Sequence, residues 1–440
     1  MKKFDAKNIT LKSLWQLFIV VAIPFITVTG ATVIPYTLRL PCIYAVSISF
    51  LLIFLLSDIK LKFNAVSVAA FFLLSYIGIS IAYSYDSSST VQLFLLYLCA
   101  FSLLFIDLPD NYYDKLLTIT YVICSVIAFS ILLSAVVENC MMKYFWFIVN
   151  PTHTAQVTNA INNELAIGAY SGFAREKAEA AYIMNVGIAI LFSRYFSFGK
   201  LEKKDVFMLL VFLAALMLTG KRTLLIIAIL AFAIFMVISN VKSKVFKTAS
   251  IILIALCFAF IVIMFIPKVA NVFDRFMDQE NMTSFGSRDA LWKYITMMIA
   301  QFPLFGAGFG SYNQFAYDNG LRVGGNKWMF NGHNCYLQVF GELGIVGSAI
   351  FAAFVILAFI FTIKSIKKFK NNPNEAKLCY YSLYIQILII IYSATGNPTY
   401  SRQIIFIWFF SIGMILHVNR KNNSDIKILK NAKIHERQYL

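Results

Sequence analysis

Residues 331–347 have the sequence NGHNCYLQVFGELGIVG, and this stretch joins the two kinds of segment from which the chain is built. It ends the longest weakly hydrophobic segment of the protein and opens a long apolar one. His333 is one of four histidines in the chain, and it stands where the polar segment meets the apolar one. That position is typical of a membrane–water interface, so His333 is the first candidate functional residue.

The composition indicates an integral membrane protein. Hydrophobic residues make up 60% of the chain and charged residues 13%, and 43 of its 440 residues are Phe. Soluble domains have about a quarter charged residues. The apolar runs are about 20 residues long and do not alternate with polar residues, which favours helices over a β-barrel. We therefore predict an all-α integral membrane protein.

About twelve apolar segments are candidates for transmembrane helices. Four lysines precede the first segment, but it is long for a signal peptide and others follow, so we predict a retained helix. The segments form one membrane domain, residues 1–417, followed by a basic cytoplasmic tail, 418–440. The predicted spans are 14–35, 38–56, 65–84, 91–106, 115–137, 180–195, 206–220, 223–239, 246–266, 335–362, 379–394 and 402–417.

The distribution of Lys and Arg orients these helices. With the N-terminus inside, about two thirds of the 38 Lys and Arg residues lie on the inner side, as the positive-inside rule requires. Two larger loops, about 138–179 and 267–334, then lie outside. The net charge of +17 is accounted for by topology and by contact with anionic membrane lipid, not by nucleic-acid binding.

Several cations fall on the predicted outer side. Lys221 and Arg222 follow Gly220 in a tight turn between two apolar segments, against the usual charge bias, and Arg222 could grip a diphosphate through its planar fork. The alternative is a helix-end cation that extends to the interface. Arg175 in the first loop is either a ligand contact or half of a surface ion pair with Glu176.

The second outer loop contains a predicted interfacial helix, 287–298, and a glycine-rich run, 303–312. Arg288 near the helix start is either an ion-pair partner or a ligand contact, and Ser287 is a plausible N-cap. The glycine-rich run lacks the flanking strand and the Lys-Ser/Thr pair of a nucleotide-binding loop. It more plausibly allows close backbone packing or a sharp turn.

His333 has two interpretations. It could cap the helix that begins near Asn334, or it could accept a proton at neutral pH at the mouth of an arginine-bearing outer cavity. Glu342, nine residues later, is the only acid well inside a predicted span, which suggests a role for it. Gly341, Gly344 and Gly347 are spaced by three, which fits a small-residue face for helix packing. Neither the cysteines nor the acidic residues show a metal-site spacing.

These motifs carry a family resemblance. His333-Asn334, followed after nine residues by Gly344-x-x-Gly347, resembles a signature of the O-antigen ligase and O-antigen polymerase superfamily. The Thr-Gly-Lys-Arg-Thr-Leu turn, the Ser-Arg-x-x-Leu-Trp helix and the Pro-Leu-Phe-Gly-x-Gly turn are similar to that group in order and placement. The resemblance is most specific over residues 219–347.

The resemblance implies a GT-C-like helical glycosyltransferase in the bacterial inner membrane, with its active site facing the periplasm and with no metal or nucleotide cofactor. The donor would be a glycan on undecaprenyl diphosphate. His333 would be the general base, Arg222 would hold the diphosphate, and Arg288 would assist. Arg175 and Arg402 are added from the predicted topology, and Lys221, Asn334 and Glu342 complete the candidate substrate-binding residues. A chain-length regulator is a further partner that the resemblance leaves open.

Three functions stay open at this point. The glycine-containing loops look more like those of the polymerases, which join lipid-linked repeat units into O-antigen or capsular polysaccharide. The alternative within the family is an O-antigen ligase, which transfers the glycan to lipid A core. A transporter or flippase of lipid-linked glycan is the alternative outside it, although such proteins usually carry ionisable residues at mid-membrane depth, and the predicted spans hold few.

Overall fold

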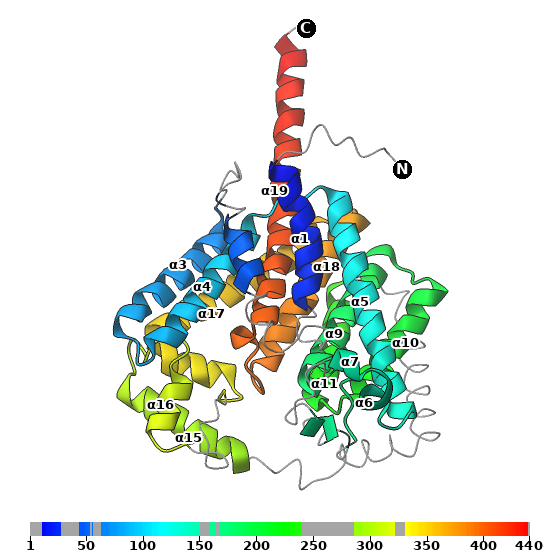
Figure 1. The fold of residues 1–440 in the computed structure, drawn as a ribbon. Helices are drawn as coiled ribbons and strands as arrows, with labels where there is room; N and C mark the ends of the chain where they lie inside the picture. Colours follow the sequence, from blue (N-terminus) through cyan, green and yellow to red (C-terminus); the bar gives the residue numbers. More distant parts are fainter. Residues whose placement is uncertain are drawn as a thin grey trace.

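A computed structural model describes residues 11–27, 44–52, 63–149, 168–239, 286–321 and 331–438, together with a few isolated positions between 55 and 165 (Figure 1). Within these ranges the regular structure consists of α-helices and short 3-10 helices, with no β-strand. The prediction of an all-α protein is therefore confirmed for the described residues.

The helices follow the predicted apolar segments closely. α3, for example, begins after Asn64, whose side chain accepts hydrogen bonds from the N–H groups of Val66 and Ser67 in a capping box. The first half of the chain contains α1 (Leu11–Thr27), α3 (Ala65–Ser80), η2 (Ile81–Tyr83), α4 (Ser87–Ser102), η3 (Leu103–Phe105), α5 (Asp110–Val136), α6 (Cys140–Tyr144) and α7 (Trp146–Val149). The second half contains α9 (Lys177–Phe198), α10 (Lys203–Leu218), α11 (Arg222–Ile238), α15 (Gly286–Gln301), α16 (Tyr312–Asp318), α17 (Cys335–Lys368), α18 (Pro373–Tyr392), η4 (Pro398–Tyr400) and α19 (Arg402–Gln438).

Several of these helices are long and apolar enough to cross a membrane, so the chain is a multi-pass membrane protein. Among the described residues, five helices meet both criteria and three shorter apolar helices do not. The predicted span at 246–266 lies outside the described residues, and the predicted number of twelve spans stays a prediction. The five are Ser87–Phe105, Asp110–Val136, Lys177–Phe198, Cys335–Lys368 and Arg402–Asn422.

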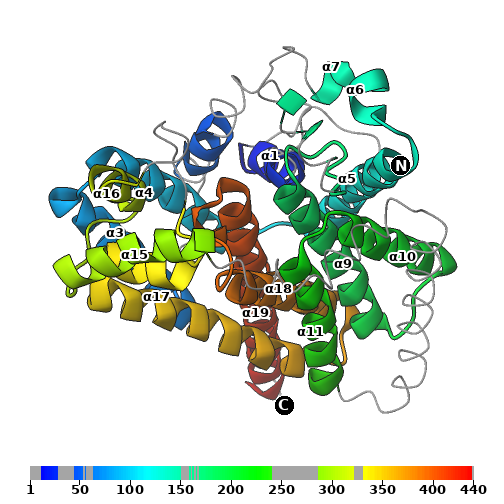
Figure 2. The same ribbon diagram turned by 90° about the horizontal axis from the view of Figure 1, so that it is seen from below.

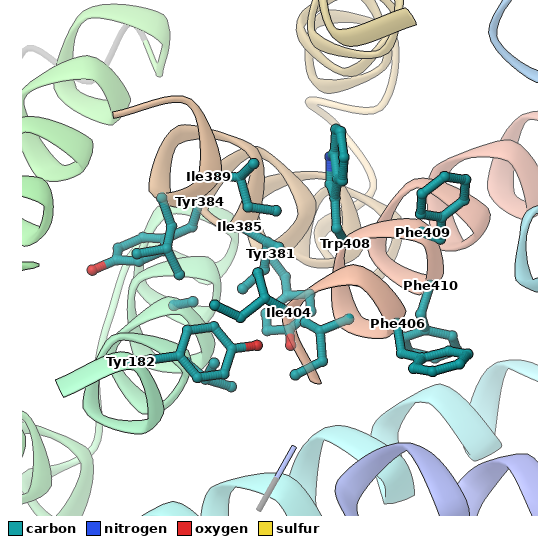
Figure 3. Packing of buried hydrophobic residues seen from close by; sticks show 14 of the residues in the cluster. Tyr182, Tyr381, Tyr384, Ile385, Ile389, Ile404, Phe406, Trp408, Phe409 and Phe410 are labelled. Carbon is teal, nitrogen blue, oxygen red and sulfur yellow. The ribbon is translucent and has the colours of Figure 1, made fainter. Parts of the chain in front are cut away.

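The centre of the fold is α9, which packs against α5, α10, α11 and α18, while α18 packs in turn against α19. Aromatic and branched side chains from α9, α18 and α19 fill the space between these helices (Figure 3). Tyr384 of α18 also donates a 2.8 Å hydrogen bond to the Asn185 side chain of α9. That bond satisfies a polar group in the core, where an unpaired one would be costly.

The two ends of the molecule differ. The C-terminal end of α19 lies at one end of the molecule in Figure 1, and α15 and α16 lie at the other. Figure 2 views the molecule from the latter end and shows α15 running beside α17. At the opposite end α19 continues as a helix to Gln438, so the predicted tail at 418–440 begins without a break in the helix.

Candidate functional site

The α17 helix, which begins directly after the candidate His333, is broken near its start. Gly344 has a φ of 63° and a ψ of −170°, a conformation open almost only to glycine. The glycine-rich turn fills the break, since Ile345 donates its N–H to the Pro303 carbonyl at 3.0 Å and Val346 donates to that of Leu304 at 3.2 Å. The close backbone packing expected of the turn is confirmed. The expectation that Gly344 lies in a continuous helical packing face is wrong.

Glu342 is a buried residue of α17, nine residues after His333. Its carboxylate is 0% exposed. One oxygen accepts hydrogen bonds from the Gly310 N–H at 2.7 Å and the Tyr400 hydroxyl at 2.6 Å. The other accepts from the Tyr312 N–H and the Gln338 side chain, both at 3.0 Å. Because protein donors fill these positions, the carboxylate has no surface left for a substrate. The predicted substrate contact by Glu342 is corrected to an internal anchor.

His333 occupies a strained position at the surface. Its backbone has a φ of 51°, one of two left-handed non-glycine residues among those described. The residue is open to solvent, and neighbouring groups partly cover its imidazole. The helix cap is instead formed by Asn334, whose side-chain oxygen accepts a hydrogen bond from the Leu337 N–H at 3.1 Å. The capping interpretation of His333 is therefore wrong. The amide nitrogen of Asn334 is left as the group that could donate to a ligand.

The structure brings predicted cations to His333. Partial burial lowers the pKa of the imidazole below its usual 6.5, and the positive charges of Arg288 and Lys221 lower it further. Glu176 acts in the opposite direction. These three charged groups come from α15, from the turn before α11 and from the residue before α9. Each is close enough to the imidazole to change its pKa. At neutral pH the imidazole is mostly uncharged, which is the form that can accept a proton.

Lys221 and Arg222 lie where α10 meets α11. The turn depends on Gly220, which has a φ of 66°. Lys221 precedes the helix and Arg222 is its first residue. The segment before α9 is attached to the end of α10, because the N–H of Tyr170 donates to the Leu218 carbonyl at 3.0 Å. The two predicted cation-bearing segments are thus adjacent.

Arg175 and Arg402 have protein partners of their own. Arg175 forms ion pairs with Glu176 at 3.5 Å and with Glu179 at 3.2 Å. Arg402, at the start of α19, lies over the Tyr44 ring, 5.3 Å from its centroid. The Arg175 ion pair with Glu176 expected as the alternative is present. A role for either arginine in binding substrate stays a prediction.

Sequence reasoning missed several polar residues around the site. Gln338 is buried and Asn397 is partly buried, and the Asn397 amide donates to the Gln338 side-chain oxygen at 2.7 Å. Tyr392, at the end of α18, lies within electrostatic reach of Glu176, Glu179 and Arg288. The spacing of Gln338 and Glu342 by four residues in an apolar run is the one available signal, since such residues share a helix face.

The described residues also bear on metal binding. Within the part of the chain that the structure describes, no three His, Cys, Asp or Glu residues lie close enough together to hold a metal ion.

Comparison with known proteins gives one family match. Residues 207–352 match the family model described as O-Antigen ligase. The matched region contains Lys221, Arg222, Arg288 and His333, together with the broken start of α17. Comparison with curated proteins gives no significant match. Residues 207–352 are thus similar to the O-antigen ligase family, which supports the superfamily that the motifs predict.

Proposed function

We propose that this protein is a glycosyltransferase that polymerises undecaprenyl diphosphate-linked oligosaccharide repeat units into O-antigen or capsular polysaccharide. It would act at the outer face of the bacterial inner membrane, without a metal cofactor. The family match to O-Antigen ligase supports a glycan-transferring enzyme in this superfamily. The choice of polymerase over ligase rests on the glycine-containing loops around Arg175 and at residues 306–312.

The observation that carries the proposal is the set of charges around His333. Arg288 and Lys221 act on the imidazole, and both belong to segments that the family motif covers. Transfer of a glycosyl group from a diphosphate requires cations close to a proton acceptor. The leaving group gains negative charge while the attacking hydroxyl loses its proton.

The step balances with these groups alone. The acceptor hydroxyl oxygen attacks the anomeric carbon of the donor, and a new glycosidic C–O bond forms. The bond from that carbon to the diphosphate oxygen breaks, and its electron pair leaves with the diphosphate. His333 takes the hydroxyl proton, and Arg222, Lys221 and Arg288 stabilise the negative charge on the diphosphate.

The remaining candidates belong to the edges of the site. Asn334 would donate a hydrogen bond from its amide nitrogen to the glycan. Arg175 and Arg402 would contact either the acceptor glycan or the donor diphosphate, and both already have protein partners that fix their side chains. The lipid tail of the donor would lie against the apolar helix faces in the membrane. A chain-length regulator would be a separate protein partner.

A second candidate is supported by the description of the matching family. That description is O-Antigen ligase, and a ligase would use the same base and the same cations with a different acceptor, lipid A core. The difference between the two enzymes lies in the acceptor, so acceptor choice is the property to test.

The experiment uses the full chain purified into nanodiscs with an undecaprenyl diphosphate-linked repeat unit as the sole glycan. A ladder of products on a gel is the result expected of a polymerase. Transfer only after addition of lipid A core would identify the ligase. No product with either acceptor, together with movement of the glycolipid between leaflets of liposomes, would overturn the enzyme proposal in favour of a transporter.

A further inference from the structure

The residue before His333 is held on both sides. The N–H of Gly332 donates a 2.9 Å hydrogen bond to the buried side-chain oxygen of Gln338. Its carbonyl accepts a 3.0 Å hydrogen bond from the Trp292 indole of α15. A Cβ at this position would lie 2.4 Å from the terminal methyl carbon of Ile295, so a larger residue would require that side chain of α15 to move. Gly332 is thus fixed between α15 and α17.

The position of the His333 imidazole depends on this backbone. Among the described residues, no hydrogen bond or ion pair holds its side chain. The left-handed backbone sets the direction in which the Cβ points, and such a conformation persists only where its neighbours enforce it. Gly332 on one side and the Asn334 cap on the other supply that constraint.

The Gln338 amide is oriented in turn by Glu342. The amide nitrogen of Gln338 donates to the Glu342 carboxylate at 3.0 Å. A carboxylate accepts hydrogen bonds but, when ionised, cannot donate them, so this contact leaves the amide oxygen facing Gly332 and Asn397. Both of those partners are donors, which an amide turned the other way would repel. A chain of hydrogen bonds therefore connects Glu342 through Gln338 to Gly332, the residue before His333.

We propose that Gln338 is a positioning residue, which acts through Gly332 to hold the His333 imidazole in place, and that Glu342 sets the orientation of its amide. The inference deepens the proposed function, because it presumes that His333 is the group that reacts. It assigns no substrate contact to Gln338, whose side chain is 1% exposed.

The first test observes His333 directly and does not depend on activity. The protein is labelled at its histidine rings, and the imidazole signals are followed by NMR as the pH is changed, with His333→Ala identifying the His333 signal. In Gln338→Leu the imidazole should move away from the groups that partly cover it and from the positive charges of Arg288 and Lys221. Its pKa should then rise towards the usual value, and the signal should broaden.

Gln386→Leu is the matched control. Gln386 is also a buried glutamine, 2% exposed, and it donates hydrogen bonds to Thr362 and Ser382 on the inner part of α17 and α18. Its loss should lower stability and leave the His333 titration unchanged. A folded Gln338→Leu protein whose His333 titrates as in the wild type would overturn the proposal, whatever the enzyme activity.

The second test measures glycosyl transfer. Gln338→Leu should reduce kcat by about 10- to 100-fold with KM for the lipid-linked donor nearly unchanged, since small displacements of a reacting group cost that much. The same change in a His333→Ala background should cost little more, because the two residues act in one unit. Full multiplication of the two losses would show that Gln338 acts independently of His333. Absence of wild-type transfer would reject the proposed function and leave the NMR result standing.

Discussion

Gly306 and Gly344 approach each other so closely that neither has room for a side chain. A Cβ on Gly306 would lie 2.5 Å from the Gly344 nitrogen, and a Cβ on Gly344 would lie 2.5 Å from the Gly306 nitrogen. Both residues also have a positive φ. The glycine-rich turn and the broken start of α17 therefore form one unit, and that unit carries both the Glu342 anchor and the short helical segment after His333.

Alanine at either glycine should destabilise the protein by more than about 2 kcal/mol, because backbone atoms that cannot give way add to the strain of a positive φ. The measurement is thermal unfolding in detergent of Gly306→Ala and Gly344→Ala. Gly320→Ala is the matched control, since Gly320 has a φ of 103° and a Cβ there would lie 4.0 Å from the Tyr294 hydroxyl oxygen. Gly320→Ala should lower the free energy of unfolding only by the strain of a positive φ, about 1–2 kcal/mol. Equal losses at all three positions would contradict the account of the contact.

The spans were largely predictable from sequence, whereas the break in α17 was not. An apolar run predicts a helix because a segment buried in lipid must form its backbone hydrogen bonds internally. The ends of α5, α9, α10 and α18 agree with those of their apolar runs within several residues. Gly344 sits in such a run, and the same glycine spacing fits both a packing face and a break. Only the carbonyls of Pro303 and Leu304, some forty residues earlier, distinguish the two.

The candidate site was predictable as a set of residue types but not as a set of contacts. His333, Lys221 and Arg288 stand out because cations and a histidine are rare at helix ends on the predicted outer side. Glu342 stands out as an acid in a span, but its partners at Gly310, Tyr312 and Tyr400 lie 30 to 58 residues away in the sequence. Sequence periodicity relates residues on one helix face only, so it could not show that those donors enclose the carboxylate.

The topology can be tested by labelling single cysteines from outside. Asp318→Cys on α16 should react with a membrane-impermeant maleimide in intact spheroplasts, and Glu202→Cys, between α9 and α10, should react only after lysis. Both native residues are exposed, and the basic residues beside Glu202 should stay inside. The five cysteines among the described residues are buried. Cys42 and Cys257 are replaced by serine in this background. Labelling of Glu202→Cys in intact spheroplasts and of Asp318→Cys only after lysis would show that the topology is the reverse of the predicted one.

The pH dependence of transfer should follow the His333 charge environment. Since its pKa lies below 6.5, activity should be retained down to about that pH and fall at more acidic values, where the imidazole takes a proton. Lys221→Met or Arg288→Met removes a positive charge, which should raise the pKa and move the acidic limb of kcat/KM to higher pH.

Glu176→Gln provides the opposite control, because that carboxylate raises the His333 pKa. Its loss should move the acidic limb to lower pH. Shifts of the same sign in the cationic and anionic variants would show that the limb does not report His333.

Arg222 should be replaceable by lysine only at a cost in donor affinity. Lysine keeps the charge but loses the planar pair of donors that matches a diphosphate. The affinity of the nanodisc-embedded protein for undecaprenyl diphosphate should fall by about tenfold in Arg222→Lys and further in Arg222→Ala. Each factor of ten corresponds to a loss of about 1.4 kcal/mol of binding free energy. Unchanged affinity in Arg222→Ala would remove Arg222 from the diphosphate site.

The most direct test of the catalytic role of His333 separates donor binding from bond formation. Initial rates of glycosyl transfer and the affinity for the lipid-linked donor are measured together, for the wild type and for folded His333→Ala. If His333 is the general base, the rate falls by about 10²- to 10⁴-fold while donor affinity stays within about twofold. A folded His333→Ala protein that transfers glycan at the wild-type rate would contradict the account.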